Sequence, residues 1–212
     1  DLLGHFNAFE KRYYERNTLQ ALYRAQTDAD QDRLHIVLLD EMNLSRPEQY
    51  FAEFLSAMEL SEQDWDRTIR TNLRGTFLCI QRAAKRMQAT GGAIVNIGSG
   101  ANRIPFPSLG DYAASKGGIE MLTKVAAIEL GKFKIRVNCV APGAIENERT
   151  QRESPDYGTT WGGITPLGRV GTESDVAETV AYLVSPASSF VTGQTLYVDG
   201  GLWTQGVWPY DV

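Results

Sequence analysis

Apolar residues recur along this chain in two spacings, which predict short buried strands alternating with helices. Four short runs rich in apolar residues predict strands, and the first of them is wholly apolar, as is typical of a strand that a parallel sheet buries on both faces. They span residues 35–39, 93–97, 135–140 and 195–198. Apolar residues three or four positions apart predict helices over residues 6–26, 47–59, 62–89, 111–130 and 175–184. Gly131 follows the fourth helix and is expected to close it. This alternation predicts an α/β fold built on a parallel sheet.

Composition changes near residue 60 and divides the chain into two segments. Gly4 is the one glycine among residues 1–60, whereas the whole chain contains 20. The first segment carries eleven acidic and six basic side chains, while the second, 61–212, carries equal numbers of both. No Pro- or Gly-rich linker separates them, because Ser61 and Asp64 fit the capping positions of the next helix. We therefore expect the two segments to have different origins.

Charge and cysteine content argue against several classes of protein. The net charge of -5 disfavours a surface that holds nucleic acid by its phosphates. The longest uncharged run, residues 179–198, is broken by Ser, Thr, Pro, Gly and Gln, so we expect no membrane span. Cys79 and Cys139 stand in apolar surroundings without framework spacing, which predicts two buried, unpaired thiols and a cytoplasmic location. His5 and His35 are isolated, so no structural zinc site is expected.

The strongest chemical pattern is Tyr112-Ala-Ala-Ser-Lys116 near the start of a predicted helix. Residues four apart share one face of a helix, so the phenol and the ammonium group point the same way. A phenol has an ordinary pKa of about 10, and a neighbouring cation stabilises its deprotonated form. Lowering that pKa to near neutrality takes about 4 kcal/mol and gives an efficient general acid–base. The alternative is an ordinary Tyr–Lys pair on a helix surface.

Three further segments accompany this pair. Ser99 follows a predicted strand, at the edge where open parallel sheets bind ligands, and its hydroxyl could hold a substrate carbonyl oxygen. Asn72 interrupts the apolar stripe of the 62–89 helix and needs a hydrogen-bond partner, which is either backbone or a water of a proton relay. Pro142 and Gly143 follow the next strand in a turn that lets a cofactor approach the backbone closely.

Residues 61–201 resemble the second half of a short-chain dehydrogenase/reductase. The matching segments occur in the order and spacing of that family: DWDRTIRTNLRGTF, GGAIVNIGS, YAASK, KIRVNCVAPGAI, PLGRVG and FVTGQTLYVDGG. The resemblance implies a partial Rossmann-type parallel sheet of about four strands, with helices on both faces. It also implies an enzyme that interconverts an alcohol and a carbonyl with NAD or NADP. The small-molecule substrate stays open, because a sugar, a polyol or a 3-oxoacyl group would all fit.

The resemblance also implies roles for particular residues. Tyr112 would be the catalytic acid–base, Lys116 would lower its pKa and hold the nicotinamide ribose, and Ser99 would bind the reacting oxygen. Asn72 would order the relay water. Cofactor contacts would come from Tyr112, Lys116, Pro142, Gly143 and Ile145. One departure is Asn147, which stands where the family often has threonine.

The first half of that family has no counterpart in this sequence. Its glycine-rich TGxxxGxG turn, which holds the cofactor pyrophosphate, is missing from the 212 residues. Residues 1–60 instead resemble the Walker B region of McrB-like AAA+ NTPases, with Asp40 and Glu41 after an apolar strand. That resemblance implies these two carboxylates as an alternative metal site, for Mg²⁺. The phosphate-holding GxxxxGK(S/T) loop of NTPases is also missing.

These observations predict an NAD(P)-dependent oxidoreductase that is impaired because the cofactor cradle is missing. An AAA+ NTP-binding fragment and an inactive chimera are the alternatives. We expect no nucleic-acid or membrane partner, and a homo-oligomer formed through the helices at 62–89 and 111–130. Residues 146–161 would form a substrate lid or a mobile loop, and the aromatic tail 202–212 would dock on the core or a neighbouring subunit. The arginines of the long helix are expected to form a solvated face: Arg67, Arg70 and Arg74.

Overall fold

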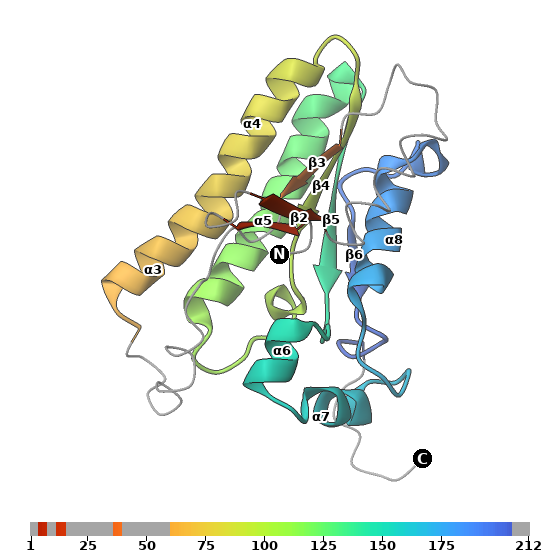
Figure 1. Ribbon diagram of the computed structural model, residues 1–212. Coiled ribbons are helices and arrows are strands. Elements are labelled where there is room, and N and C mark those ends of the chain that lie inside the picture. The colour runs from red at the N-terminus through yellow and green to blue at the C-terminus, as the bar shows by residue number, and fades with distance from the viewer. Residues whose placement is uncertain (1–3, 8–11, 16–35, 40–59, 205–212) are drawn as a thin grey trace.

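The parallel sheet expected from the sequence is present. The computed structural model describes residues 4–7, 12–15, 36–39 and 60–204. Within these residues, four strands pair in parallel in the order β3-β4-β5-β6 (Figure 1). Their bounds are Ile36–Leu39 for β3, Gly92–Ile97 for β4, Ile135–Pro142 for β5 and Thr195–Val198 for β6. The four predicted strands are confirmed, and their carboxyl ends meet at one edge of the sheet.

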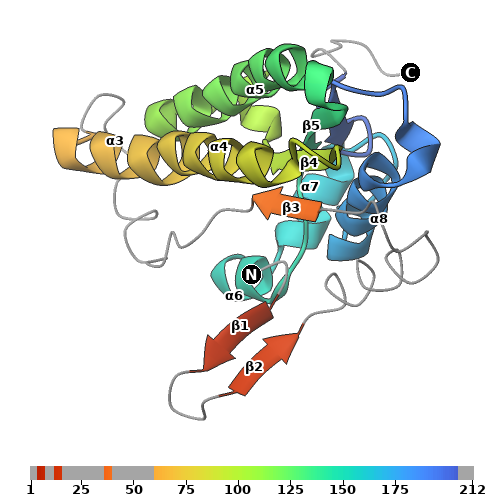
Figure 2. The ribbon, with the colours of Figure 1, turned by 90° about the horizontal axis from the view of Figure 1, so that it is seen from above.

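Helices connect the strands and cover both faces of the sheet. Their bounds are Glu62–Thr68 (α3), Ile69–Arg74 (η1), Gly75–Met87 (α4), Gly110–Leu130 (α5), Glu148–Glu153 (α6), Tyr157–Ile164 (α7) and Glu173–Val184 (α8). Short 3-10 turns lie at Gly100–Asn102 (η2), Gly131–Phe133 (η3) and Pro186–Ser188 (η4). Helices α4 and α5 lie side by side on one face of the sheet, and α8 covers the other (Figures 1 and 2). Among the described helices, none is both long and apolar enough to cross a membrane.

The alternation of side chains along the strands divides the core into two layers. On the α8 side, Val95 of β4 packs with Val180 of α8, and both are almost completely buried. On the opposite side, the neighbouring Ile94 packs with Ile80 of α4 and Ala126 of α5. Successive strand residues point to opposite faces, so a wholly apolar strand supplies both layers at once. This confirms the prediction of a strand covered on both faces by helices.

The helix predicted over residues 6–26 is wrong where the structure describes it. Residues Gly4–Asn7 form strand β1 and Arg12–Glu15 form strand β2, which pair as an antiparallel hairpin. The hairpin is a separate two-stranded sheet, set apart from the parallel sheet in Figure 2. Its second strand contains two adjacent tyrosines, and aromatic residues favour strands. The predicted helix at 47–59 and the Walker B-like residues Asp40 and Glu41 lie outside the described residues.

The long helix predicted over residues 62–89 is continuous but not regular. Residues Ile69–Arg74 form a π-helical turn, η1, between α3 and α4. Helix α5 ends at Leu130 with Gly131 as its C-cap, as predicted, but the φ of Gly131 is -55°, which is helical, and the chain continues into η3. Lys134, with a φ of 57°, is the left-handed residue that ends this segment and turns it into β5.

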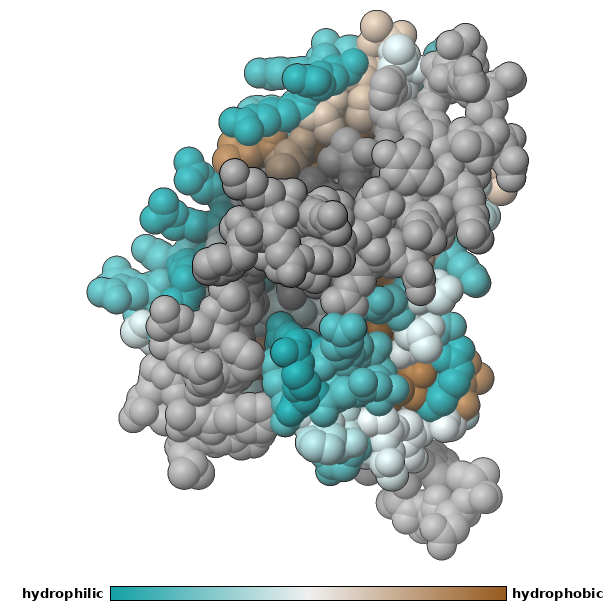
Figure 3. All heavy atoms as spheres, viewed as in Figure 1, coloured by the Kyte–Doolittle hydropathy of each residue, from teal (hydrophilic) through white to brown (hydrophobic). Residues whose placement is uncertain are grey.

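Part of the apolar stripe on the long helix faces solvent. Trp65 is 42% exposed and Phe77 is 46% exposed, although both belong to the predicted stripe. Cys79 is also exposed, so the prediction of two buried thiols is wrong for this residue, whereas Cys139 is fully buried. Both thiols are free, as predicted. Figure 3 shows apolar side chains over α4 between hydrophilic ones. The apolar stripe is wider than the part of the helix that the sheet and α5 cover, so some of its side chains stay exposed.

Candidate active site

The predicted site residues gather where the central strands end. Ser99 lies just beyond β4, and Gly143 lies just beyond β5. Helix α5 begins at Gly110 and carries Tyr112 and Lys116 in its first turns. Open parallel sheets bind ligands outside the carboxyl ends of their strands, which is the edge that these residues share.

Tyr112 and Lys116 form a close pair on α5. The Lys116 Nζ atom lies 5.3 Å from the centroid of the Tyr112 ring. The lysine is only 2% exposed, and Nζ donates a hydrogen bond to the Ile97 carbonyl oxygen, 3.3 Å away at the end of β4. Burying an ammonium group is costly, so a lysine fixed under the ring of a tyrosine favours a functional pair over the surface-pair alternative.

The hydroxyl of Ser99 is held by the turn that follows it. Ser99 is extended, with a φ of -163°, and caps the short helix η2. Its Oγ accepts a hydrogen bond from the Ala101 N–H at 3.2 Å. An oxygen that accepts from the backbone keeps its own O–H as a donor. The side chain is half-buried, so this donor can meet the oxygen of a bound molecule at the edge of the sheet.

Asn72 lies inside the π-helical turn η1 and joins this turn to α5. It is 5% exposed, and its Nδ2 donates to Ser115 Oγ at 3.1 Å. Ser115 Oγ in turn donates to the Tyr112 carbonyl oxygen at 2.7 Å. The other amide atom, Oδ1, is buried and has no partner among the described residues. A buried amide oxygen of this kind fits a bound water, as the relay role requires.

The segment after β5 is fixed tightly at the same edge. Gly143 N–H donates to the Val198 carbonyl oxygen at 2.9 Å, and a Cβ at Gly143 would lie 2.7 Å from the Cα of Asp199. Only glycine therefore allows β5 and β6 to end so close together. Ile145 forms a parallel bridge with Gly171, which holds the next part of the segment. Pro142, Gly143 and Ile145 thus stand together beside the carboxyl ends of the strands.

Asn147 has a local structural role. It caps α6, and its Oδ1 accepts hydrogen bonds from the N–H groups of Arg149 and Thr150, each at 2.9 Å. Thr150 Oγ1 completes the capping box by accepting from the Asn147 N–H at 2.9 Å. The departure from threonine at this position therefore gives a good helix cap. The predicted lid, residues 146–161, folds into α6 and the first part of α7.

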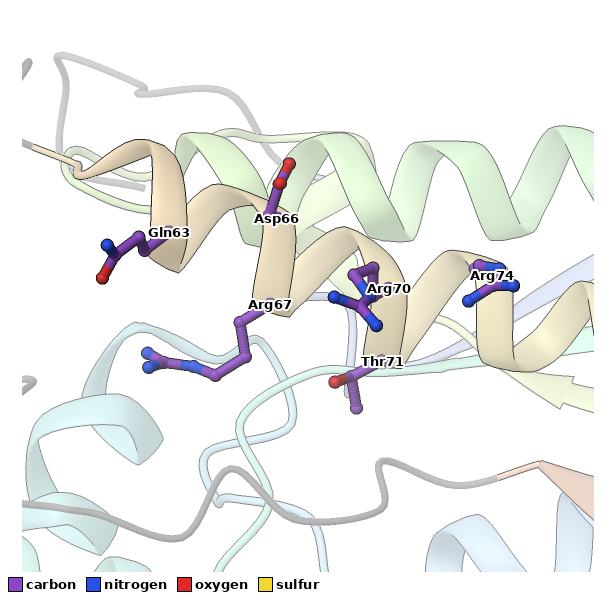
Figure 4. A pocket seen from close by; sticks show the side chains of 6 residues that line it. All are labelled: Gln63, Asp66, Arg67, Arg70, Thr71 and Arg74. Carbon is purple, nitrogen blue, oxygen red and sulfur yellow. The ribbon is translucent and has the colours of Figure 1, made fainter.

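The three arginines of the long helix are exposed, as predicted. They line a hollow of about 600 Å³ together with Gln63, Asp66 and Thr71, all from α3 and η1 (Figure 4). Arg67 pairs with Asp64 at 2.6 Å along the same helix. In Figure 4, Arg67 and Thr71 extend from one side of the helix and Arg70 and Arg74 extend toward the viewer, and all four side chains line the hollow.

An aromatic cluster near the site was not foreseen from the sequence. The rings of Phe106, Tyr157, Trp161 and Trp203 come from three separate segments and meet edge to face or tilted. The sequence signal was limited to the aromatic content of the lid and the tail. The expectation that the tail docks on the core is confirmed for Leu202 and Trp203, and residues 205–212 lie outside the described residues. Within the described residues, no three His, Cys, Asp or Glu side chains form a possible metal site.

Comparison with known proteins identifies the family. The family described as Enoyl-(Acyl carrier protein) reductase matches residues 49–203. The chain belongs to the short-chain dehydrogenase/reductase family. It is 42% identical over 147 residues to 3-oxoacyl-(acyl-carrier-protein) reductase FabG from Staphylococcus aureus, covering 69% of this chain and 60% of that protein. It is also 42% identical over 153 residues to (3R)-3-hydroxyacyl-CoA dehydrogenase from Rattus norvegicus, covering 71% of this chain and 58% of the relative.

Solved structures support the same family. A gluconate 5-dehydrogenase from Burkholderia cenocepacia, in complex with NADP and tartrate, superposes with a TM-score of 0.69 at 30% sequence identity. The superposition covers 89% of this chain and 71% of that structure. Family members of this kind are oxidoreductases, so the α/β Rossmann-like fold and the enzyme class agree with the sequence prediction. The chain spans about 60% of the length of the FabG relative that it matches.

Proposed function

We propose that this site interconverts an alcohol and a carbonyl, using NAD or NADP as the hydride carrier. The observation that supports the proposal is one continuous set of contacts. It runs from Asn72 through Ser115 to the backbone of Tyr112, and from the Tyr112 ring to Lys116 and the end of β4. Ser99 follows that strand end by two residues. An acid–base, a cation, a hydroxyl donor and a water site are therefore joined through three elements.

Each side chain has a distinct task in this reaction. The Tyr112 phenol gives its proton to the carbonyl oxygen during reduction and takes it back during oxidation. Lys116 stabilises the phenolate that remains, because a cation close to the ring favours the deprotonated form. The Ser99 hydroxyl donates to the same substrate oxygen and orients it. Asn72 holds with its Oδ1 the water through which the proton is restored.

The cofactor would be held by residues on both sides of the site. Pro142, Gly143 and Ile145 would line the nicotinamide, and Lys116 and Tyr112 would contact its ribose. The tight ending of β5 against β6 fits this role, since a backbone without side-chain bulk lets a flat ring approach. When bound, the nicotinamide supplies the hydride. The choice between NAD and NADP is left open by these residues.

We further propose that the 212-residue chain alone binds the cofactor weakly. The sequence contains no TGxxxGxG turn, whose backbone N–H groups hold the pyrophosphate. Two or three charge-assisted hydrogen bonds at about 1.5–3 kcal/mol each correspond to about two to six orders of magnitude in affinity. A cofactor that is normally micromolar would then bind at millimolar concentration or above. Titration with NADH and NADPH, followed by their fluorescence, measures this directly.

The test of the catalytic proposal is NAD(P)H oxidation with a panel of carbonyl compounds. At saturating cofactor, we expect turnover that falls by at least about 100-fold in Tyr112→Phe, because general acid catalysis is lost. Tyr182→Phe is the matched control, since Tyr182 lies exposed on α8 at the far face of the sheet. Equal rates in the Tyr112→Phe variant and the wild type would exclude the mechanism.

We also propose that the chain forms a homo-oligomer through α4 and α5. Helix α5 exposes Met121, Val125 and Ile128, which recur at helical spacing, and the neighbouring α4 exposes Phe77. Contiguous apolar surface of this kind marks protein–protein contacts. Sedimentation at micromolar concentration should show an oligomer that Ile128→Glu dissociates. The control is Phe190→Ser, because Phe190 is fully exposed in a loop elsewhere.

A further inference from the structure

A cluster of aromatic rings lies at the same edge of the sheet, packed against Ala144 of the proposed cofactor-lining segment. Phe106 lies in the loop between η2 and α5, Trp161 lies in α7, and Trp203 follows β6. The Phe106 ring centroid lies 5.2 Å from that of Trp203 and 6.1 Å from that of Trp161. The two indoles are 6.4 Å apart, and the three contacts are all edge to face. Three segments distant in sequence thus meet in one triangle of rings.

The triangle adjoins the residue that would bind the reacting oxygen. A Cβ at Gly100, the residue after Ser99, would clash with Trp203 Nε1, so the indole lies directly on this backbone. The Asp199 carboxylate accepts a hydrogen bond from the backbone N–H of Trp203 at 3.1 Å, which holds the main chain of this tryptophan in place. Asp199 is also the residue packed against Gly143. Trp203 therefore stands between the Ser99 turn and the Gly143 turn, at the edge where the substrate must enter.

The three rings are partly exposed to solvent and also pack on buried residues beneath them. Phe106, Trp161 and Trp203 are all half-buried, so each keeps part of its ring open. The fully buried members beneath them are small or aliphatic: Ala144, Val170 and Leu202. Among the described residues, this cluster contains no charged side chain. The one polar atom of Trp203, Nε1, is buried and has no partner among the described residues.

We propose that Phe106, Trp161 and Trp203 form the wall on which the non-reacting part of the substrate packs, so that the site selects apolar carbonyl compounds. This inference rests on the proposed function and specifies its substrate class. A substrate with an aryl or alkyl group next to the carbonyl removes apolar surface from water against these rings. On this wall, a polyhydroxylated or carboxylated substrate finds only the two indole N–H groups as donors, one of them buried, and no acceptor, so most of its lost hydration is not replaced.

Binding can be measured without cofactor through tryptophan fluorescence. Trp161 and Trp203 lie in the wall, so a bound aryl ketone should quench their emission. The probes are ethyl benzoylacetate, which is apolar, and gluconate, which is a polyhydroxylated acid. We expect ethyl benzoylacetate to bind at least about tenfold more tightly than gluconate. In Phe106→Leu, the affinity for ethyl benzoylacetate should fall by about tenfold, because one face of the triangle is lost.

Matched variants separate the wall from general effects on folding. Phe190→Leu is the control for Phe106→Leu, because it makes the same change at a fully exposed phenylalanine and should leave binding unchanged. Gly100→Ala is the second variant, since a Cβ there must push the Trp203 indole aside. It should weaken ethyl benzoylacetate binding and alter the near-ultraviolet circular dichroism of the tryptophans. Equal binding of both probes, or equal affinity in Phe106→Leu and Phe190→Leu, would overturn the proposal.

Different results would contradict the proposed aromatic wall and the proposed reaction. If ethyl benzoylacetate binds through the rings but NAD(P)H oxidation is the same in wild type and Tyr112→Phe, the wall stands and the proposed function is wrong. If Tyr112-dependent turnover is observed but a polyhydroxylated ketone is reduced faster than ethyl benzoylacetate, the reaction stands and the wall proposal is wrong. No quenching by ethyl benzoylacetate up to its solubility limit also counts against the wall.

Discussion

One arginine, in a strand that is mostly apolar, connects the parallel sheet to the end of α8. Arg136 of β5 is half-buried and donates hydrogen bonds to five oxygens at the end of α8 and in the following loop. The acceptors are the carbonyls of Leu183 at 2.8 Å, Ser185 at 3.1 Å, Val191 at 3.3 Å and Val184 at 3.5 Å, and Ser188 Oγ at 3.0 Å. Burial lowers the pKa of the Arg136 guanidinium, but an arginine stays charged at neutral pH.

Replacing Arg136 by methionine should lower the free energy of unfolding by about 3 kcal/mol. Hydrogen bonds from a charged donor contribute about 1.5–3 kcal/mol each, and three of the five are 3.1 Å or shorter. Three at the lower value give about 4–5 kcal/mol, and water that reaches the partly open site recovers some of this. The variant also loses a cation at the C-terminus of α8, where the helix dipole favours positive charge.

Denaturation in urea, followed by far-ultraviolet circular dichroism, measures the effect. We expect a lower midpoint with an unchanged slope, because the loss is one of contacts and not of compactness. Arg136→Lys should recover about 1 kcal/mol, since it keeps the charge but donates to fewer oxygens. Arg82→Met is the control, because Arg82 is exposed on α4, and it should stay within about 0.5 kcal/mol of wild type. A loss below about 1 kcal/mol in Arg136→Met would refute this reasoning.

Two further predictions concern titratable groups. Burial raises the pKa of the Cys139 thiol to about 11, whereas Cys79 is exposed. At pH 8 the native chain should therefore react with one equivalent of a disulfide reagent and the denatured chain with two. A count below two in the denatured chain would show a disulfide. The bidentate hydrogen bond from Arg169, together with the Thr172 cap, holds the pKa of Asp175 well below its ordinary value. The resulting stability is present above the unfolded pKa of about 3.9 and is lost as pH falls, so the destabilisation by Asp175→Asn at pH 7 should shrink toward pH 2. An unchanged difference across that range would mean that the pair contributes through packing alone.

The strands could be predicted from the sequence because each is a short and mostly apolar run, although β4 and β5 are almost wholly buried and β6 is half-buried. Because parallel strands run in one direction, their predicted carboxyl ends also indicated that Ser99 and Gly143 lie at the same edge of the sheet. The pairing of Tyr112 with Lys116 followed from their spacing on one helix, and the role proposed for them followed from the family motif. The π-helical turn at Ile69–Arg74 could not be predicted, because the apolar stripe continues through it and the contact of Asn72 with Ser115 is tertiary. The aromatic triangle was missed for the same reason: its members share no local pattern.

Two polar residues inside the mostly apolar strands form hydrogen bonds that fix how a helix and a loop lie on the sheet. Asn96 of β4 donates to Thr123 Oγ1 of α5 at 2.8 Å, and Asn138 of β5 donates to the Val191 carbonyl oxygen at 2.9 Å. Gln194 N–H also donates to Asn138 Oδ1, at 3.0 Å. A buried amide that lacks its partner is costly, so each of these bonds holds only one alignment of helix or loop on the sheet. Apolar packing alone tolerates small shifts between layers, whereas the proposed active site, which spans η1, β4 and α5, does not. The polar residues of the strands therefore fix the position of α5 and of the segment before β6 relative to the sheet. Because Tyr112 and Lys116 lie on α5, their position is fixed as well.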